Sequence, residues 1–194
     1  PSSIIAQRIL LTANTPIAAP SANLSGKISP TSANQVFDSL NGKIDAILDG
    51  GVSQVGLEST IISTNPIRIL RPGSITREKL ESIGDVTLLN EDRDSTITAP
   101  GQLKSHYAPI SNVRLNVDYP SSHEILLGFG NIQNAALNLS PSANLSEAAS
   151  NLFRMLSEID QIAIKNGIQT IAISPIPQKG IGDAINDRIE RAAA

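Results

Sequence analysis

A loop rich in hydroxyl and amide side chains is the part of the chain best suited to chemistry. It runs from Ala19 to Thr31 and reads Ala-Pro-Ser-Ala-Asn-Leu-Ser-Gly-Lys-Ile-Ser-Pro-Thr. Small polar residues between prolines and a glycine are typical of a rigid loop that holds a small polar ligand at the end of a strand. The same residues are also ordinary in surface turns. The loop alone therefore indicates either a ligand site or a plain turn.

Three side chains of this loop are candidates for binding a phosphorylated ligand. The hydroxyls of Ser21 and Ser29 can donate hydrogen bonds to phosphate oxygens, and the Asn23 amide offers both a donor and an acceptor. Asn23 could instead close a turn upon itself. Ser29 precedes Pro30, which predicts a helix N-cap, and a helix N-terminus is itself a favourable phosphate site.

Three further candidates lie outside the loop. Ser59 begins an extended run, Arg71 ends one, and Tyr107 lies in a Pro-rich segment. An Arg guanidinium can hold a phosphate bidentately or stack on an adenine ring. The alternatives are a Ser59 hydroxyl in solvent, a solvated Arg71, and a Tyr107 that anchors a linker. We interpret His106 as structural and Asp49 as a turn former rather than a metal ligand.

The elements that position these residues alternate between helical and extended patterns. Helices are predicted over 3–14, 29–40, 76–84, 146–165 and 180–194, and strands over 16–19, 44–48, 58–63, 67–70, 113–117, 124–129 and 170–174. Asn65-Pro66 separates two of the strands and predicts a hairpin. The alternation indicates an α/β protein with a mostly parallel sheet.

Two glycine- and serine-rich segments of the second half need no ligand to explain them. Residues 141–146 repeat the sequence of 20–25, and we interpret them as a helix N-terminus capped by Ser146. Residues 180–188 lack the Lys-Ser/Thr ending of a phosphate loop. We therefore interpret their glycines as sites of close packing.

Composition limits the class of protein. The chain has 194 residues, of which 40% are hydrophobic and 3% aromatic, so the core must consist mostly of Ile, Leu, Val and Ala. The absence of Cys excludes disulfides and thiolate metal sites and fits a cytoplasmic protein. A net charge of −3 argues against strong direct nucleic-acid binding. No apolar run is long enough to span a membrane.

Several motifs occur in a characteristic order. They are Pro20-Ser21-Ala22-Asn23 with Ser25-Gly26 and Ser29-Pro30-Thr31, Ile47-Leu48-Asp49-Gly50-Gly51, Gly56-Leu57-Glu58-Ser59-Thr60, Ile69-Leu70-Arg71-Pro72-Gly73, Ala99-Pro100-Gly101 with His106-Tyr107-Ala108-Pro109, and Gly180-Ile181-Gly182-Asp183-Ala184-Ile185-Asn186-Asp187-Arg188. Together they resemble the two-domain, YrdC-like threonylcarbamoyl-AMP synthases. The resemblance covers nearly the whole chain.

The resemblance implies a fold and an activity. The expected fold is α/β: the C-terminal part of a YrdC-like twist domain over 1–90, a linker over 91–110 that crosses the catalytic face, and a small Rossmann-like domain over 111–194. The family makes L-threonylcarbamoyl-AMP from ATP, L-threonine and bicarbonate and releases pyrophosphate. The product passes to tRNA-modifying proteins, which place the group on the tRNA adenosine next to the anticodon.

The resemblance also implies roles for single residues. Those expected to contact ATP are Ser21, Asn23, Ser29, Arg71 and Tyr107. Those expected to contact L-threonine are Ala19, through its backbone, and Ser59. Magnesium is expected to be held mainly by the ATP phosphates, with no dedicated protein ligands, and no catalytic residue is assigned.

The chain departs from the family in one respect. The family's basic phosphate-binding stretch has no counterpart, and Pro1 leads directly into an apolar helix pattern. We therefore expect a fragment with apolar surface exposed on residues 1–90. The alternative function is an incomplete, non-enzymatic nucleotide- or tRNA-binding module. A related carbamoyltransferase is a further alternative, against which the linker and the C-terminal extension argue.

Overall fold

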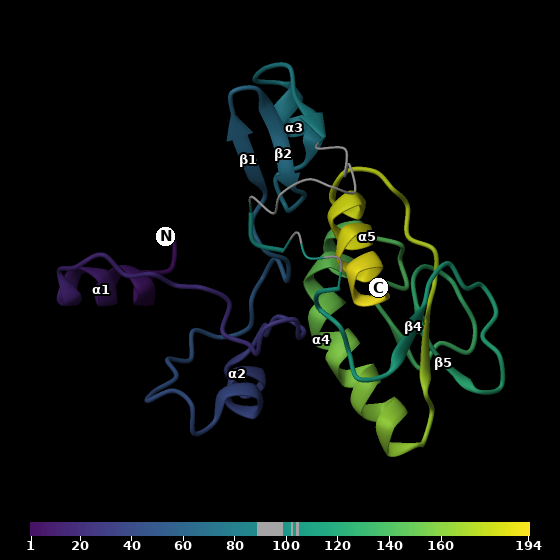
Figure 1. Cartoon of the computed structure of the whole chain (residues 1–194). Coiled ribbons are helices and arrows are strands. Elements are labelled where there is room, and N and C mark those ends of the chain that lie inside the picture. The colour runs from purple at the N-terminus through teal and green to yellow at the C-terminus, as the bar shows by residue number, and fades with distance from the viewer. Residues whose placement is uncertain (89–98, 102, 104) are drawn as a thin grey trace.

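The C-terminal region, residues 105–194, is built around a parallel four-stranded sheet (Figure 1). The computed structural model describes residues 1–88, 99–101, 103 and 105–194. The sheet has the order β4-β7-β5-β6, from β4 (Asn112–Arg114), β7 (Thr170–Ile173), β5 (Glu124–Gly128) and β6 (Leu137–Asn138). The prediction of a mostly parallel sheet is therefore confirmed for this region. Sequence patterns missed the two-residue strand β6.

Two helices cover one face of this sheet and form the main core. α4 (Leu145–Lys165) and α5 (Ile181–Ala192) pack on each other, and α4 also contacts β5 and β7. The apolar stripe of α4 is almost completely buried, because its residues recur at helical spacing toward the sheet. The buried members of the stripe are Ala148, Ala149, Leu152, Phe153, Leu156, Ile159 and Ala163.

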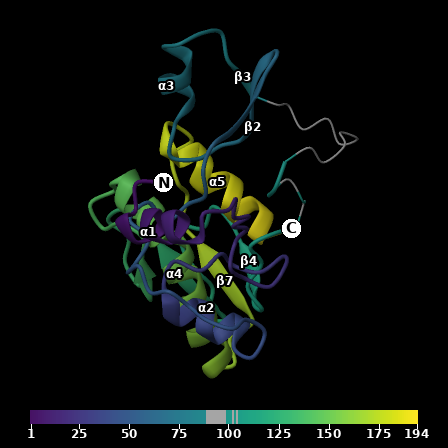
Figure 2. The same cartoon turned by 90° about the vertical axis from the view of Figure 1, so that its left-hand side faces the viewer.

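The predicted hairpin forms the smaller sheet. β1 (Ile61–Thr64) pairs antiparallel with β2 (Ile67–Arg71), and Thr64 lies opposite Ile67. β3 (Thr87–Leu88) adds a parallel strand beside β2. The short helix α3 (Arg77–Glu81) precedes β3 and begins after Thr76, as the sequence predicts. Figure 2 shows α5 between this small sheet and the larger one.

The first residues of the chain form helices with little packing. α1 (Ile4–Ala13) is capped by Ser3 and has no buried residue. It projects away from the other elements (Figure 1). α2 (Ala33–Leu40) also has no buried residue. The strands predicted over 16–19 and 44–48 are wrong, because these segments are irregular and no strand of the described residues pairs with them.

The prediction of exposed apolar surface is confirmed for residues 1–88. The large apolar side chains of this region with high exposure are Ile4, Ile5, Ile9, Leu11, Ile17, Leu24, Phe37, Ile44, Leu48, Val52, Val55, Ile62, Ile75 and Ile83. Apolar surface that stays exposed in a folded chain is a common feature of sites that contact other molecules. The surface is therefore one that other polypeptide could cover.

Two predicted helix caps are shifted by a few residues. α2 is capped by Ser32, whose hydroxyl accepts a hydrogen bond from the Gln35 N–H, and not by Ser29. α4 is capped by Asn144, whose Oδ1 accepts from the N–H groups of Ser146 and Glu147. Ser146 itself lies inside the helix. In both helices the cap is a residue with extended backbone whose side-chain oxygen accepts a hydrogen bond from an N–H of the first turn.

Part of the predicted linker lies outside the described residues. The described part touches both neighbours: the Ala108 N–H donates to the Gly26 carbonyl (3.1 Å), and the His106 N–H donates to the Arg191 carbonyl (3.1 Å). The domain boundaries themselves stay a prediction. No helix of the described residues is both long and apolar enough to cross a membrane.

Candidate functional site

An open cavity of about 590 Å³ lies between the serine-rich loop and the segment 47–58. Ser21, Ser29 and Glu58 contribute polar groups to its wall, and Phe153 of α4 contributes an aromatic ring. The glycines and small residues of 50–56 leave the cavity open, because their side chains fill little of it. Two of the predicted nucleotide contacts, Ser21 and Ser29, therefore face one common space.

A buried ion pair connects this wall to α5. The Ser29 hydroxyl donates to Glu58 Oε1 (2.7 Å), and Arg188 Nε donates to Glu58 Oε2 (3.0 Å). Burial by itself would raise the pKa of Glu58, but the Arg188 charge and the hydrogen bonds from Ser29 and Arg188 outweigh it and lower the pKa. Glu58 therefore stays ionised and holds the Ser29 hydroxyl in one orientation.

Arg188 is fully buried and has a second carboxylate partner. Its Nη1 donates to Asp187 Oδ2 (2.5 Å), and Asp187 Oδ1 accepts from Arg191 Nε (3.0 Å). Arg191 in turn donates to the Leu103 carbonyl (3.0 Å). One turn of α5 thus contacts Glu58 on one side and the Leu103 carbonyl on the other.

Arg71 joins two backbone segments. Its Nε and Nη2 donate to the Ser59 carbonyl (3.1 and 3.0 Å), and its Nη1 donates to the Pro100 carbonyl (3.2 Å). The side chain is buried rather than solvated, so the alternative of a solvated Arg71 is wrong. Ser59 is exposed at the surface, where its hydroxyl also lies 3.4 Å from Arg71 Nη2.

Tyr107 is an anchor of the linker. Its ring is fully buried, lies 5.2 Å from the Phe153 ring, and has the Arg188 guanidinium 5.5 Å from its centroid. Its backbone φ is +62°, a left-handed conformation that is uncommon for Tyr and marks a tight change of chain direction. Burial raises the pKa of its hydroxyl, for which the described part of the chain offers no hydrogen-bond partner.

Gly101 lets the linker pass close to both Arg71 and Tyr107. A Cβ at this position would lie 2.9 Å from the Tyr107 hydroxyl and 3.1 Å from Arg71 Cδ. The φ of Gly101 is +86°, which only glycine adopts readily. The structure therefore brings Arg71, Ser59 and Tyr107 together around one glycine.

Two predicted contacts are placed differently. The Asn23 amide donates to the carbonyls of Leu24 and Lys27 (2.9 Å each), so it closes a turn, as its alternative interpretation proposed. Ala19 is exposed in an irregular segment and does not belong to the cavity wall. These two residues are not brought together with the others.

His106 and Asp49 have the structural contacts expected of them. The His106 ring packs edge-on against Tyr107, and burial lowers its pKa. Asp49 Oδ1 accepts from the Gly51 N–H (2.9 Å), which is the contact of a turn former. Within the described residues, no group of three or more His, Asp or Glu side chains is arranged to hold a metal ion.

The sequence analysis did not assign roles to Glu58, Arg188 or Phe153. The structure supplies a cation partner for Glu58 from α5, namely Arg188. The residues are 130 positions apart, and no local pattern relates them. The sequence did carry one signal for this ion pair, the Asp187-Arg188 pair inside an amphipathic helix. An Arg that is buried in such a helix needs a carboxylate partner.

Comparisons with known proteins agree with this arrangement. Residues 75–194 match the family model described as "Threonylcarbamoyl-AMP synthase, C-terminal domain", and residues 1–73 match the model described as "Telomere recombination". Threonylcarbamoyl-AMP synthases of Pyrococcus abyssi and Bacillus subtilis are each 33% identical to the whole chain. The chain spans 62% and 61% of their lengths.

Solved structures resemble the chain over its full length. A crystal structure of Pyrococcus abyssi Sua5 complexed with L-threonine superposes with a TM-score of 0.83 at 31% identity, and a variant of the same protein with 0.80 at 30%. The whole chain is covered in both, against 62% and 61% of the solved chains. The match confirms the α/β fold expected from the sequence.

Proposed function

Because the chain belongs to the threonylcarbamoyl-AMP synthase family, we propose that it carries part of the site that makes L-threonylcarbamoyl-AMP. In this reaction the threonine amine takes up bicarbonate with loss of water to give a carbamate. A carbamate oxygen then attacks the α-phosphorus of ATP, and pyrophosphate leaves. The enzyme must bind the phosphates, orient the carbamate and exclude water.

One observation carries the proposal. Four predicted residues that are far apart in the sequence are linked through direct contacts. Ser29 donates to Glu58, and the next residue, Ser59, accepts from Arg71. Arg71 and Tyr107 both lie close to Gly101. A scaffold role alone would not require a hydroxyl on the cavity wall to be oriented by a buried ion pair. The arrangement supports a site for a polar ligand with phosphate groups.

The predicted residues other than Asn23 and Ala19 have the following proposed roles. Ser21 would donate a hydroxyl hydrogen bond to an ATP phosphate oxygen from the cavity wall. Ser29 would do the same only when its hydroxyl turns away from Glu58, to which it donates its single proton in this structure. Arg71 would supply positive charge beside the same ligand while its guanidinium keeps Ser59 in place. Ser59, which is exposed, would contact L-threonine. Tyr107 is fully buried, so it would support the nucleotide site by anchoring the linker against Phe153 and Arg188, which was the alternative interpretation of this residue.

The remaining participants follow from the chemistry of the substrates. Magnesium would arrive with ATP, bound by its phosphates, since the described residues provide no cluster of metal ligands. The adenylate product would pass to the proteins that transfer the threonylcarbamoyl group to tRNA. We place this activity in the cytoplasm.

Calorimetric titration of the chain with ATP, magnesium and L-threonine tests the proposal. We expect saturable ATP binding that Arg71→Ala abolishes and that Arg68→Ala leaves intact, because Arg68 is an exposed Arg on the same strand. Pyrophosphate release in the presence of bicarbonate then measures turnover. Equal ATP affinity in both variants would contradict the assignment of Arg71.

A second outcome of the same experiment distinguishes the synthase from its main alternative, an incomplete nucleotide-binding module. The exposed apolar surface of residues 1–88 favours a chain that binds nucleotide without completing the reaction. Saturable binding without pyrophosphate release would identify this incomplete module. Release of pyrophosphate that depends on L-threonine would identify the synthase.

A further inference from the structure

A second cavity lies in the C-terminal region, at the carboxyl edge of its parallel sheet. It has a volume of about 570 Å³, and its wall includes Phe129, directly after β5, and Ser174, directly after β7. Asp118 and Tyr119 of the loop that follows β4 form the opposite side. In open parallel sheets, ligands bind in crevices outside the carboxyl ends of the strands.

A buried polar atom in the wall of this cavity lacks a partner. Ser174 is 2% exposed, and its hydroxyl has no hydrogen-bond partner among the residues that the structure describes. Leaving a buried hydroxyl without a hydrogen bond is costly, and such groups call for an explanation. The hydroxyl oxygen is itself closed off from the cavity, so contacts with a ligand must come from the exposed side chains of the wall.

The walls of the cavity are held in place from the sheet. The Ser174 N–H donates to the Leu127 carbonyl (3.0 Å), and the Val117 N–H donates to the Ile173 carbonyl (2.9 Å). On the other side, Gly130 N–H donates to the Ser140 carbonyl (2.8 Å). Both loops are therefore fixed before any ligand binds, which lowers the entropic cost of binding.

The second wall also packs tightly against β5. A Cβ on Gly128 would lie 2.6 Å from Ile132 and 2.8 Å from Ala135, so the loop after β5 rests directly on the strand end. Val117, Leu126 and Ala172 form the apolar floor that supports the two loops. The cavity is thus built by packed residues and is not a gap between mobile loops.

The chemistry of the wall restricts the ligand. Its members with polar side chains include Asp118, Tyr119, Asn131, Gln133 and Ser174, and the wall contains no Lys, Arg or His. A carboxylate without a neighbouring cation repels phosphates and accepts hydrogen bonds from hydroxyls, as acidic residues do toward ribose. Amide side chains can pair with the edge of a purine base.

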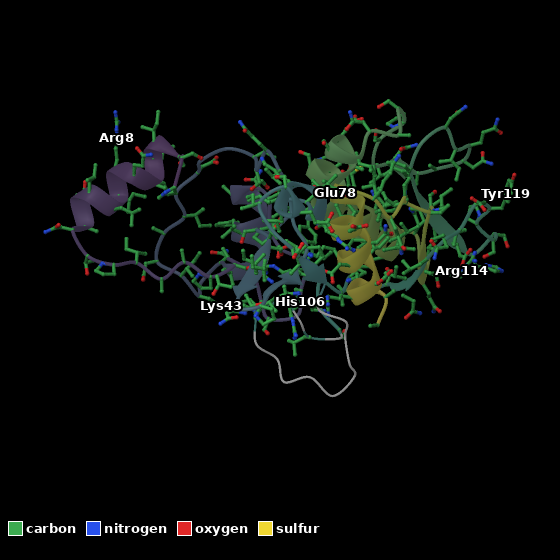
Figure 3. All side chains as sticks on the ribbon, turned by 90° about the horizontal axis from the view of Figure 1, so that it is seen from above. Arg8, Lys43, Glu78, His106, Arg114 and Tyr119 are labelled. Carbon is green, nitrogen blue, oxygen red and sulfur yellow. The ribbon has the colours of Figure 1, made fainter. Side chains whose placement is uncertain are left out.

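Aromatic rings at the rim add a stacking surface. Tyr119 is 90% exposed, and Phe129 lines the same cavity. Figure 3 shows Tyr119 at one edge of the molecule. Base stacking on an aromatic ring is favourable and tolerates different bases. Stacking, amide donors and acceptors and a carboxylate without cations together fit an uncharged nucleoside.

We propose that this cavity is a second ligand site, which binds a neutral nucleoside and discriminates against its phosphorylated forms. The base would stack on Tyr119 and hydrogen-bond to Asn131 or Gln133. Asp118 would accept hydrogen bonds from ribose hydroxyls. The site is separate from the cavity lined by Ser29 and Glu58.

Amide chemical shifts of the isotopically labelled chain test this site, with adenosine as the probe and ATP as the comparison. We expect adenosine to shift the amides of residues 118–120, 131–134 and 174 saturably, whereas ATP leaves them in place. Asp118→Asn and Tyr119→Ala should each weaken adenosine binding about tenfold, and Tyr119→Phe should retain it. Both side chains lie in a surface loop, so the variants should fold.

Two results would overturn the proposal. One is the absence of shifts at these amides with adenosine in the millimolar range. The other is an equal response to adenosine and ATP, or one that Tyr119→Ala leaves unchanged. Shifts confined to residues 21–33 and 58 would show that adenosine binds only the first cavity, which also contradicts the second site.

Discussion

The two regions of the molecule bury their apolar residues to very different extents. In residues 105–194, the strands and helices enclose a core of fully buried Leu, Ile and Phe side chains. In residues 1–88, α1 and α2 bury none of theirs. Since hydrophobic burial dominates folding stability, the C-terminal region must supply most of it.

The difference explains how the candidate site is held. Ser21, Ser29, Ser59 and Arg71 lie in the thinly packed region, and Glu58 there contacts the C-terminal helix α5 through Arg188. Gly56 passes so close to α4 that a Cβ would lie 2.5 Å from the Ala149 carbonyl oxygen. The well-packed region thus serves as the support against which the site loops are fixed.

The largest expected effect is the difference in the free energy of unfolding between two Phe-to-Ala variants, one in each region. Phe153→Ala should lower the free energy of unfolding by about 3 to 5 kcal/mol, because it removes a fully buried ring and leaves a cavity. Phe37→Ala, in the 52% exposed ring of α2, should change it by less than about 1 kcal/mol. Urea denaturation measures both. Similar losses in the two variants would contradict the contrast between the regions.

Breaking the connection between the regions should have the next largest effect. Arg188→Met removes the buried guanidinium and leaves Glu58 without its cation, which should cost about 3 kcal/mol. The matched control is Arg154→Met, which breaks an exposed pair with Glu158 and should cost less than about 1 kcal/mol. Equal unfolding midpoints for Arg188→Met and the unaltered chain would contradict the role of the ion pair.

Removing helix caps sharpens the comparison. Asn144→Ala should lower the global free energy of unfolding by about 1 kcal/mol, because α4 forms part of the main core. Ser3→Ala removes the corresponding contact from α1, which has no buried residue, and should fray that helix without changing the global value. The two are separated by comparing urea unfolding with the helical signal of the native state. A global loss from Ser3→Ala would contradict the account of α1.

The smallest expected effect is a change in how the folding stability depends on pH in the acidic range. The pKa of Glu58 is lowered from its ordinary value of 4.5, so its contribution to stability is fully present above pH 4.5 and is lost as the pH falls through the lower folded-state pKa. Glu58→Gln should therefore lose less stability than the unaltered chain between neutral pH and pH 3. Parallel stability curves for the two proteins over this range would contradict the lowered pKa.

Local patterns predicted most of the C-terminal region and the hairpin of the smaller sheet. The long apolar stripe of α4, the buried run of β7 and the hairpin at Asn65-Pro66 all carry periodicity or turn chemistry that determines the element directly. The segments 16–19 and 44–48 have the same apolar character and yet form no strand. A strand exists only with a partner, and a sequence pattern cannot say whether the partner is present.

The candidate site was predictable where a residue type carries its own chemistry. Hydroxyls at Ser21 and Ser29 and the guanidinium of Arg71 follow from the motifs, and the structure places Ser21 and Ser29 on one cavity wall. The Glu58–Arg188 pair could not be predicted, because it depends on how α5 packs and not on any spacing along the chain. The Asn23 turn shows the converse, since local hydrogen bonds satisfied a side chain that could have served a ligand.

Hydrogen exchange of backbone amides, compared between the unaltered chain and Arg188→Met, tests most directly whether the C-terminal region holds the site. We predict strong protection in β5, β7 and α4 in both proteins, and loss of protection at residues 29–36 and 58–61 only in the variant. Unchanged protection at those residues, or an equal loss throughout α4, would contradict the account.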